Sequence, residues 1–156
     1  MMLNRNFKDF KFQHSRNKNQ IIYTSQKVRN DHEVLNLIDN FLREKNSFIF
    51  FESVEKGKIR GRYTIFGKNP DKIWEFNNKN SYLTTNNIKK KIKGAPEKII
   101  EEIIEKFKFK TPVGLPPICS LISGYFSYDS IRYVEKIPNK CKDDLKLPDV
   151  RLLRPR

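Results

Sequence analysis

The sequence contains few residues of the kinds that build metal sites and disulfide frameworks. It has two Cys, two His, one Trp and six Gly in 156 residues. Cys119 and Cys141 lack a CxxC partner and a nearby His cluster, so neither a zinc site nor a disulfide framework is indicated, and both are predicted to be reduced thiols. His14 and His32 lie apart from any nucleophile or metal-binding partner and are assigned no role.

Long apolar runs are also missing. No segment has the roughly eighteen consecutive apolar residues that a membrane-spanning helix needs. Residues 1–20 are polar and basic, without the apolar region and small-residue cleavage site of a secretory signal. These absences predict a soluble, cytoplasmic protein that does not act at a membrane.

Length and apolar content indicate one folded domain. A chain of 156 residues, of which 37% are hydrophobic and twelve are Phe, has enough large apolar side chains for a single core. We expect residues 1–20 to be a basic, frayed segment and residues 21–156 to form the domain.

The formal net charge of +14 would suit a polyanionic partner such as nucleic acid. A second explanation is compositional, because Lys, Asn and Ile are abundant throughout, as expected when codons are rich in A and T. The densest run, residues 89–93, has no interleaved aromatic residue, which counts against a nucleic-acid-binding module. That module is kept as an alternative.

Three helices are predicted. Asn30 and Glu33 form a capping box before an apolar series at helical spacing, which predicts a helix over residues 31–45; its apolar face is Val34, Leu35, Ile38, Phe41 and Leu42. Residues 96–107 begin with Pro and carry a broad apolar face made of Ile99, Ile100, Ile103, Ile104 and Phe107. Asp129 is predicted to cap a third helix that continues to Val134.

Short apolar, β-branched and aromatic runs predict strands at residues 20–24, 47–51, 60–66 and 72–76. Residues 77–94 are predicted to be a loop and edge strand whose lysines protect an exposed edge. A further strand is expected within residues 118–128, where Gly124 marks a close backbone approach. The predicted fold is α+β, with antiparallel β-sheet layers in a sandwich-like arrangement and about three helices at the side or end.

Three blocks of the sequence resemble one family. FFESVE at residues 50–55, RGRYTIFG at 60–67 and NPD at 69–71 are similar to the LLESVE, RGRYSIIG and xPD pattern of the large subunit (component I) of anthranilate synthase. GYFSYD at 124–129 and RYVEKIP at 132–138 resemble its GYLGYDxVRYFEKLP. DDLKLPD at 143–149 resembles its DDLGLPD. The blocks occur in the family's order from about Ile21 onward, in the amino-terminal part of that subunit.

The resemblance implies a lyase of tryptophan biosynthesis. In the family, the full-length enzyme converts chorismate and ammonia to anthranilate and pyruvate, a separate glutamine amidotransferase subunit (component II) makes the ammonia, and Mg²⁺ holds the chorismate carboxylate. Those catalytic groups belong to the family's carboxy-terminal half, to which nothing in this chain corresponds. We therefore expect a truncated or partial chain that has no catalytic residues, no metal ligands and no activity alone.

The resemblance also implies an allosteric site for the feedback inhibitor L-tryptophan. It places Glu52 and Ser53 in that site, with Phe51 adjoining it and Arg60 as a further contact across a hairpin. A carboxylate suits the ligand's ammonium group, and an apolar wall suits its indole ring. Phe50 and Phe51 replace the family's Leu-Leu pair, which adds bulk to the pocket.

Structural roles for the same residues compete with these assignments. Glu52 could pair with Arg60 or Arg62, and Ser53 could satisfy backbone groups at a strand end. Arg62 is expected to pair with Asp71 or Glu75, and Tyr63 to pack its ring. In the complete subunit, four residues are expected to form a domain-interface or core-edge network and not a catalytic set: Tyr125, Tyr128, Asp129 and Arg132. The sister lyase of folate synthesis, aminodeoxychorismate synthase component I, shares the motifs and is the alternative within the family.

Overall fold

The computed structural model describes most of the chain and divides it into two compact units. Unit 1 comprises residues 1–46 and 107–119, and unit 2 comprises residues 47–106 and 120–156. The described residues are 2–3, 11, 21, 23–25, 27–28, 30–43, 48–52, 63–78, 80–116, 119, 122–138, 140 and 142–155. Every structural statement below concerns these residues.

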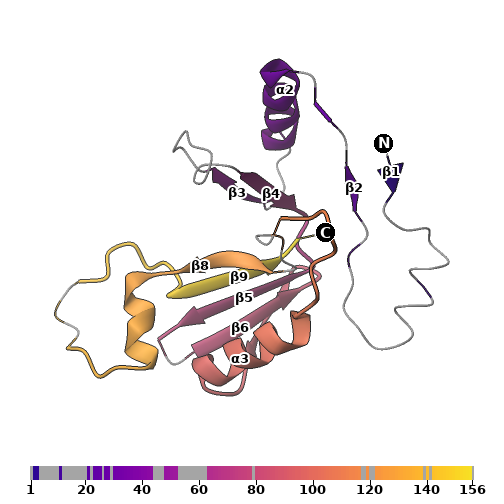
Figure 1. Ribbon diagram of the computed structural model, residues 1–156. Helices are drawn as coiled ribbons and strands as arrows, with labels where there is room; N and C mark the ends of the chain where they lie inside the picture. Colours follow the sequence, from indigo (N-terminus) through magenta and orange to yellow (C-terminus); the bar gives the residue numbers. More distant parts are fainter. Residues whose placement is uncertain are drawn as a thin grey trace. The chain divides into compact units, whose positions relative to one another are not determined.

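The described part of unit 1 includes strands β1 and β2 and helix α2 (Figure 1). β1 (Met2–Leu3) pairs antiparallel with β2 (Thr24–Ser25). Helix α2 (Asp31–Leu42) begins at the predicted residue and ends three residues before the predicted end. The predicted cap is confirmed, because Asn30 Oδ1 accepts a hydrogen bond of 3.0 Å from the Glu33 amide. Most of residues 1–20 lies outside the described part, so their fraying stays a prediction.

The buried stripe of α2 is narrower than the predicted apolar face. Phe41 is 8% exposed, and Val34 and Ile38, on the same side of the helix, are half-buried. Leu35 and Leu42, which belong to the predicted apolar face, are 63% and 43% exposed. Each follows a residue of the buried stripe and points about 100° around the helix from it, toward the edge of the apolar face.

Unit 2 begins with a strand pair. β3 (Phe48–Glu52) pairs antiparallel with β4 (Thr64–Lys68), and Phe50 lies opposite Phe66. This pair confirms the predicted hairpin arrangement, shifted by one residue in the first strand. Residues 60–62 of the predicted second strand lie outside the described part. A Cβ on Gly67 would lie 2.7 Å from Pro155 side-chain carbons, so β4 passes close to the residue that follows β9.

A five-stranded antiparallel sheet forms the rest of unit 2, in the order β7-β6-β5-β9-β8 (Figure 1). Its strands are β5 (Lys72–Asn77), β6 (Asn80–Thr85), β7 (Ile88–Ile92), β8 (Ser123–Phe126) and β9 (Val150–Arg154). β9 lies between β5 and β8, so the carboxy-terminal strand joins segments far apart in the sequence. β5 matches its prediction to within one residue.

One face of this sheet carries a large part of the core of unit 2. Trp74 and Phe76 of β5 are 5% and 0% exposed, and their partners on β9, Leu152 and Val150, are 6% and 0% exposed. Burying a side chain such as Phe76 stabilises the fold by roughly 2–3 kcal/mol. Helix α3 lies alongside β5 and β6 (Figure 1).

α3 (Pro96–Phe107) has the predicted bounds. Ile100, Ile103 and Phe107 are at most 9% exposed, which is the i, i+3, i+7 spacing of a buried helical stripe. Ile104, at the edge of the predicted apolar face, is 58% exposed.

The prediction of a loop and edge strand at residues 77–94 is corrected in part, because more of the segment is strand than was predicted. This segment forms β6, β7 and a two-residue turn in which Asn86 and Asn87 have φ of 50° and 61°. Positive φ at both central positions is the geometry that a tight hairpin needs, and Asn tolerates it. The edge role of the lysines is confirmed, because β7 is the outer strand and Lys89, Lys90 and Lys91 are exposed on it.

Asp71, just before β5, and Glu75, on β5, form ion pairs with residues of other strands of the sheet. Asp71 accepts hydrogen bonds from Nε and Nη2 of Arg154, the former at 2.6 Å, and this pairing raises the pKa of Arg154. Glu75 pairs with Lys89 at 2.5 Å and with Arg151 at 3.5 Å. The expected pairing of Arg62 with Asp71 or Glu75 lies outside the described residues.

The third predicted helix is a 3₁₀ helix, η1 (Tyr128–Tyr133), and the predicted cap is wrong. Ser127 occupies the position before the helix and makes no capping bond with its side chain. Asp129 lies inside the first turn and pairs with Arg132 instead, at 2.8 Å. A 3₁₀ helix places side chains three residues apart directly above each other, which favours this pair.

The α+β prediction is confirmed, with antiparallel sheets and three helices in the described residues. The strand expected within residues 118–128 is β8, which is shorter than that range. None of the helices described is both long enough and apolar enough to cross a membrane.

Candidate functional site

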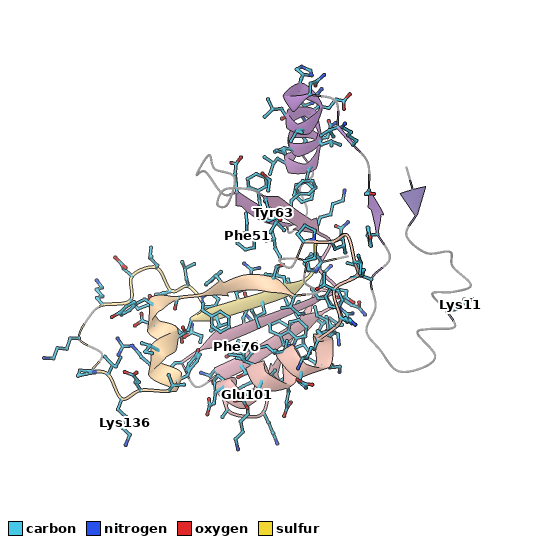
Figure 2. The ribbon with its side chains drawn as sticks, viewed as in Figure 1. Lys11, Phe51, Tyr63, Phe76, Glu101 and Lys136 are labelled. Carbon is cyan, nitrogen blue, oxygen red and sulfur yellow. The ribbon has the colours of Figure 1, made fainter. Side chains whose placement is uncertain are left out.

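The end of the β3–β4 pair carries two of the four predicted ligand-binding residues. Phe51 and Glu52 are the last residues of β3, opposite Ile65 and Thr64 of β4. Phe51 is 42% exposed, and Glu52 is also exposed. Figure 2 shows the Phe51 side chain on this strand pair. An aromatic ring and a carboxylate thus occupy consecutive positions of β3, both accessible to solvent and on opposite faces of the strand pair.

Ser53 and Arg60, the other two predicted residues, lie outside the described part of the chain. The structure therefore brings Phe51 and Glu52 together and gives no position for their predicted companions. Tyr63 is half-buried, which agrees with the expectation that its ring packs.

The two faces of the strand pair differ in exposure. Phe66 of β4 lies opposite Phe50, on the face away from Phe51, and is 43% exposed, whereas Ile49, two residues before Phe51 on the same side of β3, is 8% exposed. One end of the strand pair is therefore covered and the other, at Phe51 and Glu52, is open. A ligand that has both an apolar ring and a cation can meet the aromatic ring and the carboxylate by lying across the end of the strand pair.

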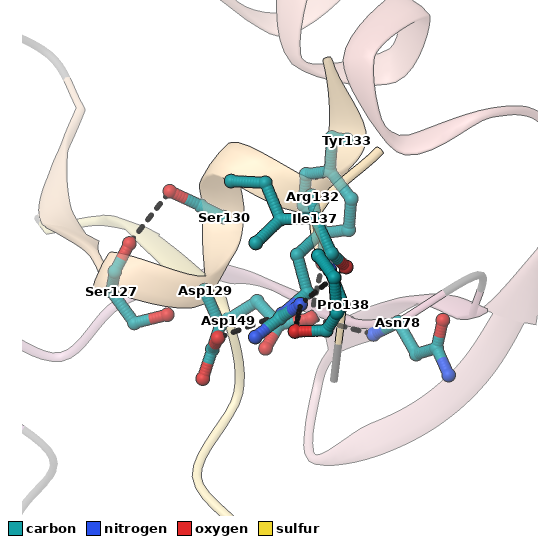
Figure 3. Close-up of polar contacts among 9 residues, drawn as sticks. All are labelled: Asn78, Ser127, Asp129, Ser130, Arg132, Tyr133, Ile137, Pro138 and Asp149. Atoms are coloured by element: carbon teal, nitrogen blue, oxygen red, sulfur yellow. Dashed lines mark hydrogen bonds and ion pairs between the residues drawn. The ribbon is translucent and has the colours of Figure 1, made fainter. Parts of the chain in front are cut away.

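A second polar cluster lies at the opposite part of unit 2, around Asp149 (Figure 3). Asp149 Oδ2 accepts a hydrogen bond from the Tyr133 hydroxyl at 2.8 Å and another from the backbone amide of Asn78 at 2.6 Å. The Asp149 backbone amide donates to Phe76 O at 2.8 Å, and its carbonyl accepts from the Ser127 amide at 2.7 Å. Asp149 thereby ties the start of β9 to η1 and to the β5–β6 turn.

Arg132 fixes the chain after η1. Its Nη1 donates to the carbonyl oxygens of Ile137 and Pro138, at 2.8 Å and 3.1 Å, while its Nε pairs with Asp129. The guanidinium group of Arg132 thus binds the Asp129 carboxylate through Nε and the backbone carbonyls of the following loop through Nη1 (Figure 3). This geometry indicates a structural role for Arg132.

The environment of Tyr133 is unfavourable to a phenolate. Burial raises the pKa of Tyr133 far above its ordinary value, and the hydrogen bond to Asp149 and the negative charges of Asp149 and Glu97 raise it further. Tyr133 therefore acts as a hydrogen-bond donor and not as a general base.

The network expected at Tyr125, Tyr128, Asp129 and Arg132 was predicted for a complete subunit, so for the tyrosines it stays a prediction. The Asp129–Arg132 pair is there, but Tyr128 is 89% exposed and Tyr125 is 38% exposed. The centre of the cluster is Asp149 with Tyr133, which the sequence reasoning missed. The signal that could have found Asp149 is its place after a Leu-Pro pair, where a short polar side chain starts a strand.

A cleft of about 910 Å³ opens beside this cluster. It is lined by the β5–β6 turn, the start of α3, the end of β8, η1 and the loop that leads to β9; the lining residues are Asn77, Asn78, Ala95, Pro96, Glu97, Tyr125, Ser127, Asp129, Arg132, Tyr133, Ile137, Lys142, Asp143, Asp144, Leu145, Leu147, Pro148 and Asp149.

The loop before β9 has one residue in an unusual conformation. Lys146 has φ of 50°, and its amide donates to Asp143 Oδ1 at 2.9 Å. In the resembled motif this position is Gly, which adopts positive φ without steric cost. The chain therefore keeps the turn despite the Lys side chain, with Asp143 as its hydrogen-bond partner.

Comparison with known proteins identifies relatives of one kind. No protein-family model matches the sequence. Anthranilate synthase component 1 of Cereibacter sphaeroides is 33% identical over 143 residues, covering 88% of this chain and 28% of that protein. Anthranilate synthase component 1 of Acetivibrio thermocellus is 37% identical over 131 residues, covering 83% of this chain and 26% of that protein. Chloroplastic anthranilate synthase alpha subunit 1 of Oryza sativa subsp. japonica is 38% identical over 123 residues, covering 70% and 21%.

The chain thus spans about a quarter of the length of these curated relatives, while the similarity extends over most of its own length. The motif blocks at residues 50–71 and 124–149 are those on which the sequence resemblance was based. Over the part that it spans, this chain belongs to the anthranilate synthase component 1 family.

Proposed function

We propose that the chain is the tryptophan-sensing portion of an anthranilate synthase large subunit, with the open end of the β3–β4 pair as its binding site. The observation that supports this most is the exposure of both Phe51 and Glu52 at the end of β3, where a ligand lying across the strand end can meet both side chains. Ser53 follows directly in sequence, and Arg60 is the further contact that the motif predicts.

The chemistry of these residues suits L-tryptophan. The Glu52 carboxylate offers an acceptor for the ammonium group, and the Phe51 ring offers an apolar surface for the indole. Aromatic pairs of this kind contribute about 0.5–1.5 kcal/mol beyond the area that they bury. Replacement of the family's Leu-Leu by Phe50-Phe51 adds such a ring and narrows the space beside it.

The whole enzyme's activity is part of the proposal. The parent enzyme converts chorismate and ammonia to anthranilate and pyruvate in the cytoplasm, with a glutamine amidotransferase subunit as ammonia source, and Mg²⁺ binds the chorismate carboxylate there. Bound tryptophan inhibits the reaction by feedback. In the described residues no three His, Cys, Asp or Glu side chains are grouped so that they could hold a metal ion, and no Mg²⁺ ligand is assigned to this chain.

These 156 residues, which span about a quarter of the relatives' length, are proposed to be inactive alone. Purified chain supplied with chorismate, ammonium and Mg²⁺ should give no anthranilate fluorescence above a protein-free control. Anthranilate formation at a rate proportional to protein concentration would overturn this part of the proposal.

Aminodeoxychorismate synthase component I is the alternative parent. The relatives described above carry the name anthranilate synthase, which favours anthranilate as the parent's product. Product analysis of an active enzyme that contains this sequence would separate the two, because one releases anthranilate and the other aminodeoxychorismate.

Isothermal titration of L-tryptophan into the chain tests the proposed site, with L-phenylalanine as the comparison ligand. We expect selective binding of L-tryptophan that weakens about tenfold in Glu52→Gln, because a charge-assisted hydrogen bond is worth roughly 1.5–3 kcal/mol. Glu101→Gln, which removes an exposed carboxylate on α3, is the matched control. Equal affinity in wild type, Glu52→Gln and the control would remove Glu52 from the site.

A further inference from the structure

The cleft beside Asp149 has a charge opposite to that of the chain. In the described part of the sequence its lining includes five carboxylates and two cations, whereas the whole chain has a formal net charge of +14. Arg132 is already paired with Asp129 and with backbone carbonyls. Among the described residues that line the cleft, Lys142 is therefore the remaining cation that can oppose the other carboxylates: Glu97, Asp143, Asp144 and Asp149. A surface of this kind attracts cationic groups and repels anions.

The negative charge of the cleft affects the pKa of Tyr133, one of its lining residues. The negative charges of Asp149 and Glu97 both add to the effect of burial in raising the pKa of Tyr133. These two carboxylates come from opposite sides of the cleft, one at the start of β9 and one on the first turn of α3. The excess of acidic groups thus acts across the cleft.

The carboxylates are spread along the cleft. Nowhere in the described residues do three His, Cys, Asp or Glu side chains converge as a metal site requires. A compact divalent cation needs several oxygen ligands within about 2.6 Å. The spacing therefore favours an extended occupant with more than one positive group.

Apolar side chains stand exposed along the same cleft. Leu145 and Leu147 are 74% and 59% exposed, and Tyr125 is 38% exposed. Small-molecule sites usually enclose most of their ligand, whereas these residues form an open rim around a space of about 910 Å³. An open groove with apolar and acidic positions suits a polypeptide segment that lies across it.

We propose that this cleft docks an extended segment of a partner protein in which Lys or Arg side chains flank a large apolar side chain. The apolar side chain packs against Leu145 and Leu147. The cationic side chains meet Glu97, Asp143 and Asp144. This interaction is independent of tryptophan binding at β3–β4 and goes beyond the proposed function.

Fluorescence anisotropy with labelled synthetic peptides tests the proposal. The probes are Lys-Leu-Lys-Leu-Lys, Lys-Gly-Lys-Gly-Lys and Glu-Leu-Glu-Leu-Glu, titrated with the 156-residue chain at low salt. Only the first should bind well, because it alone combines cations with apolar side chains. Equal binding of the Gly-containing peptide would show that the chain attracts cations without an apolar site, and equal binding of the acidic peptide would contradict the charge argument. Either result overturns the proposal.

Variants then locate the binding. Asp143→Asn with Asp144→Asn should weaken binding of the first peptide about fivefold or more, because each exposed pair contributes up to about 1 kcal/mol. Leu147→Ala should weaken it similarly by removing apolar contact. Glu101→Gln with Glu102→Gln removes the same charge from the exposed side of α3 and should leave binding unchanged. Equal losses in the Asp pair and the Glu pair would place the binding outside the cleft and sink the proposal.

Discussion

Gly124 lies where the sheet leaves no room for a side chain. A Cβ at this position would stand 1.9 Å from Arg151 O and 2.9 Å from Leu152 Cα, both of them backbone atoms of β9. Backbone atoms within a paired strand cannot move aside without breaking the pairing of β8 with β9. The sequence prediction of a close backbone approach at Gly124 is therefore confirmed.

Gly124→Ala is expected to lower the free energy of unfolding by about 3 kcal/mol or more, since overpacking at a rigid contact costs this much. Urea denaturation followed by the fluorescence of Trp74 measures it, because Trp74 is the only Trp in the chain and is buried in unit 2. Ser123→Ala in the same strand is the control. A Gly124→Ala variant as stable as this control would contradict the packing of β8 on β9.

Tyr133 gives a prediction on pH. The folded state holds the phenol proton to a higher pH than the unfolded state does, because the pKa of Tyr133 is raised. The unfolded state therefore loses this proton first as the pH rises, and the contribution of Tyr133 to stability is complete below its ordinary pKa and is lost above it. At neutral pH the Tyr133→Phe change should cost about 1 kcal/mol for the lost hydrogen bond to Asp149.

The test compares wild type with Tyr133→Phe by urea denaturation between about pH 8 and pH 11. The stability advantage of the wild type should persist to about pH 10 and shrink as the pH rises toward the raised pKa. Tyr128→Phe, at an exposed Tyr, is the control. A wild-type advantage that grows with pH would contradict the assigned environment of Tyr133.

At the scale of elements, strong periodic signals were predicted well and polar strands were not. α3 and β5 combine apolar periodicity with clear boundaries, and both were found within one residue of their predicted bounds. β6 and β7 are rich in Asn, Thr and Lys, so their apolar pattern is weak, and their Asn-Asn turn lacks the Gly that usually marks a tight hairpin. They form strands because pairing with β5 satisfies their backbone groups.

In the candidate site too, residues in a strong local motif could be predicted and residues joined by a tertiary contact could not. The motif blocks predicted Phe51 and Glu52, and the structure places both at an open strand end. Asp149 and Tyr133 were missed as a pair, because sixteen positions separate them and their contact depends on the loop between η1 and β9. Local sequence patterns carry little information about such tertiary contacts.

The β6–β7 turn offers a test at this scale. Asn87 has φ of 61°, so Asn87→Val should destabilise the hairpin by about 1–2 kcal/mol, because a β-branched residue is strained there. Asn87→Gly should be neutral or slightly stabilising. Hydrogen exchange of the β6 and β7 amides measures the difference. Equal protection in both variants would contradict the left-handed turn.

At the scale of the whole molecule, the basic lysines of β7 and the acidic cleft around Asp149 lie on different parts of unit 2. Lysines protect the outer strand β7, and one of them, Lys89, is held by Glu75 and lies 4.9 Å from the centre of the Tyr82 ring. The carboxylates gather at the far end of unit 2 around Asp149. The β3–β4 pair, with Phe51 and Glu52, belongs to neither group, so each surface can be tested without changing the others.

The most direct test of the proposed function is the location of L-tryptophan on the chain. Amide spectra of the ¹⁵N-labelled chain, recorded as L-tryptophan is added, report which residues sense the ligand. The account predicts saturable shifts concentrated at Phe51, Glu52 and the facing residues Thr64 and Ile65, with little change on addition of L-phenylalanine. A folded chain whose spectrum is unchanged by L-tryptophan, or in which the shifts occur only around Asp149, would contradict it.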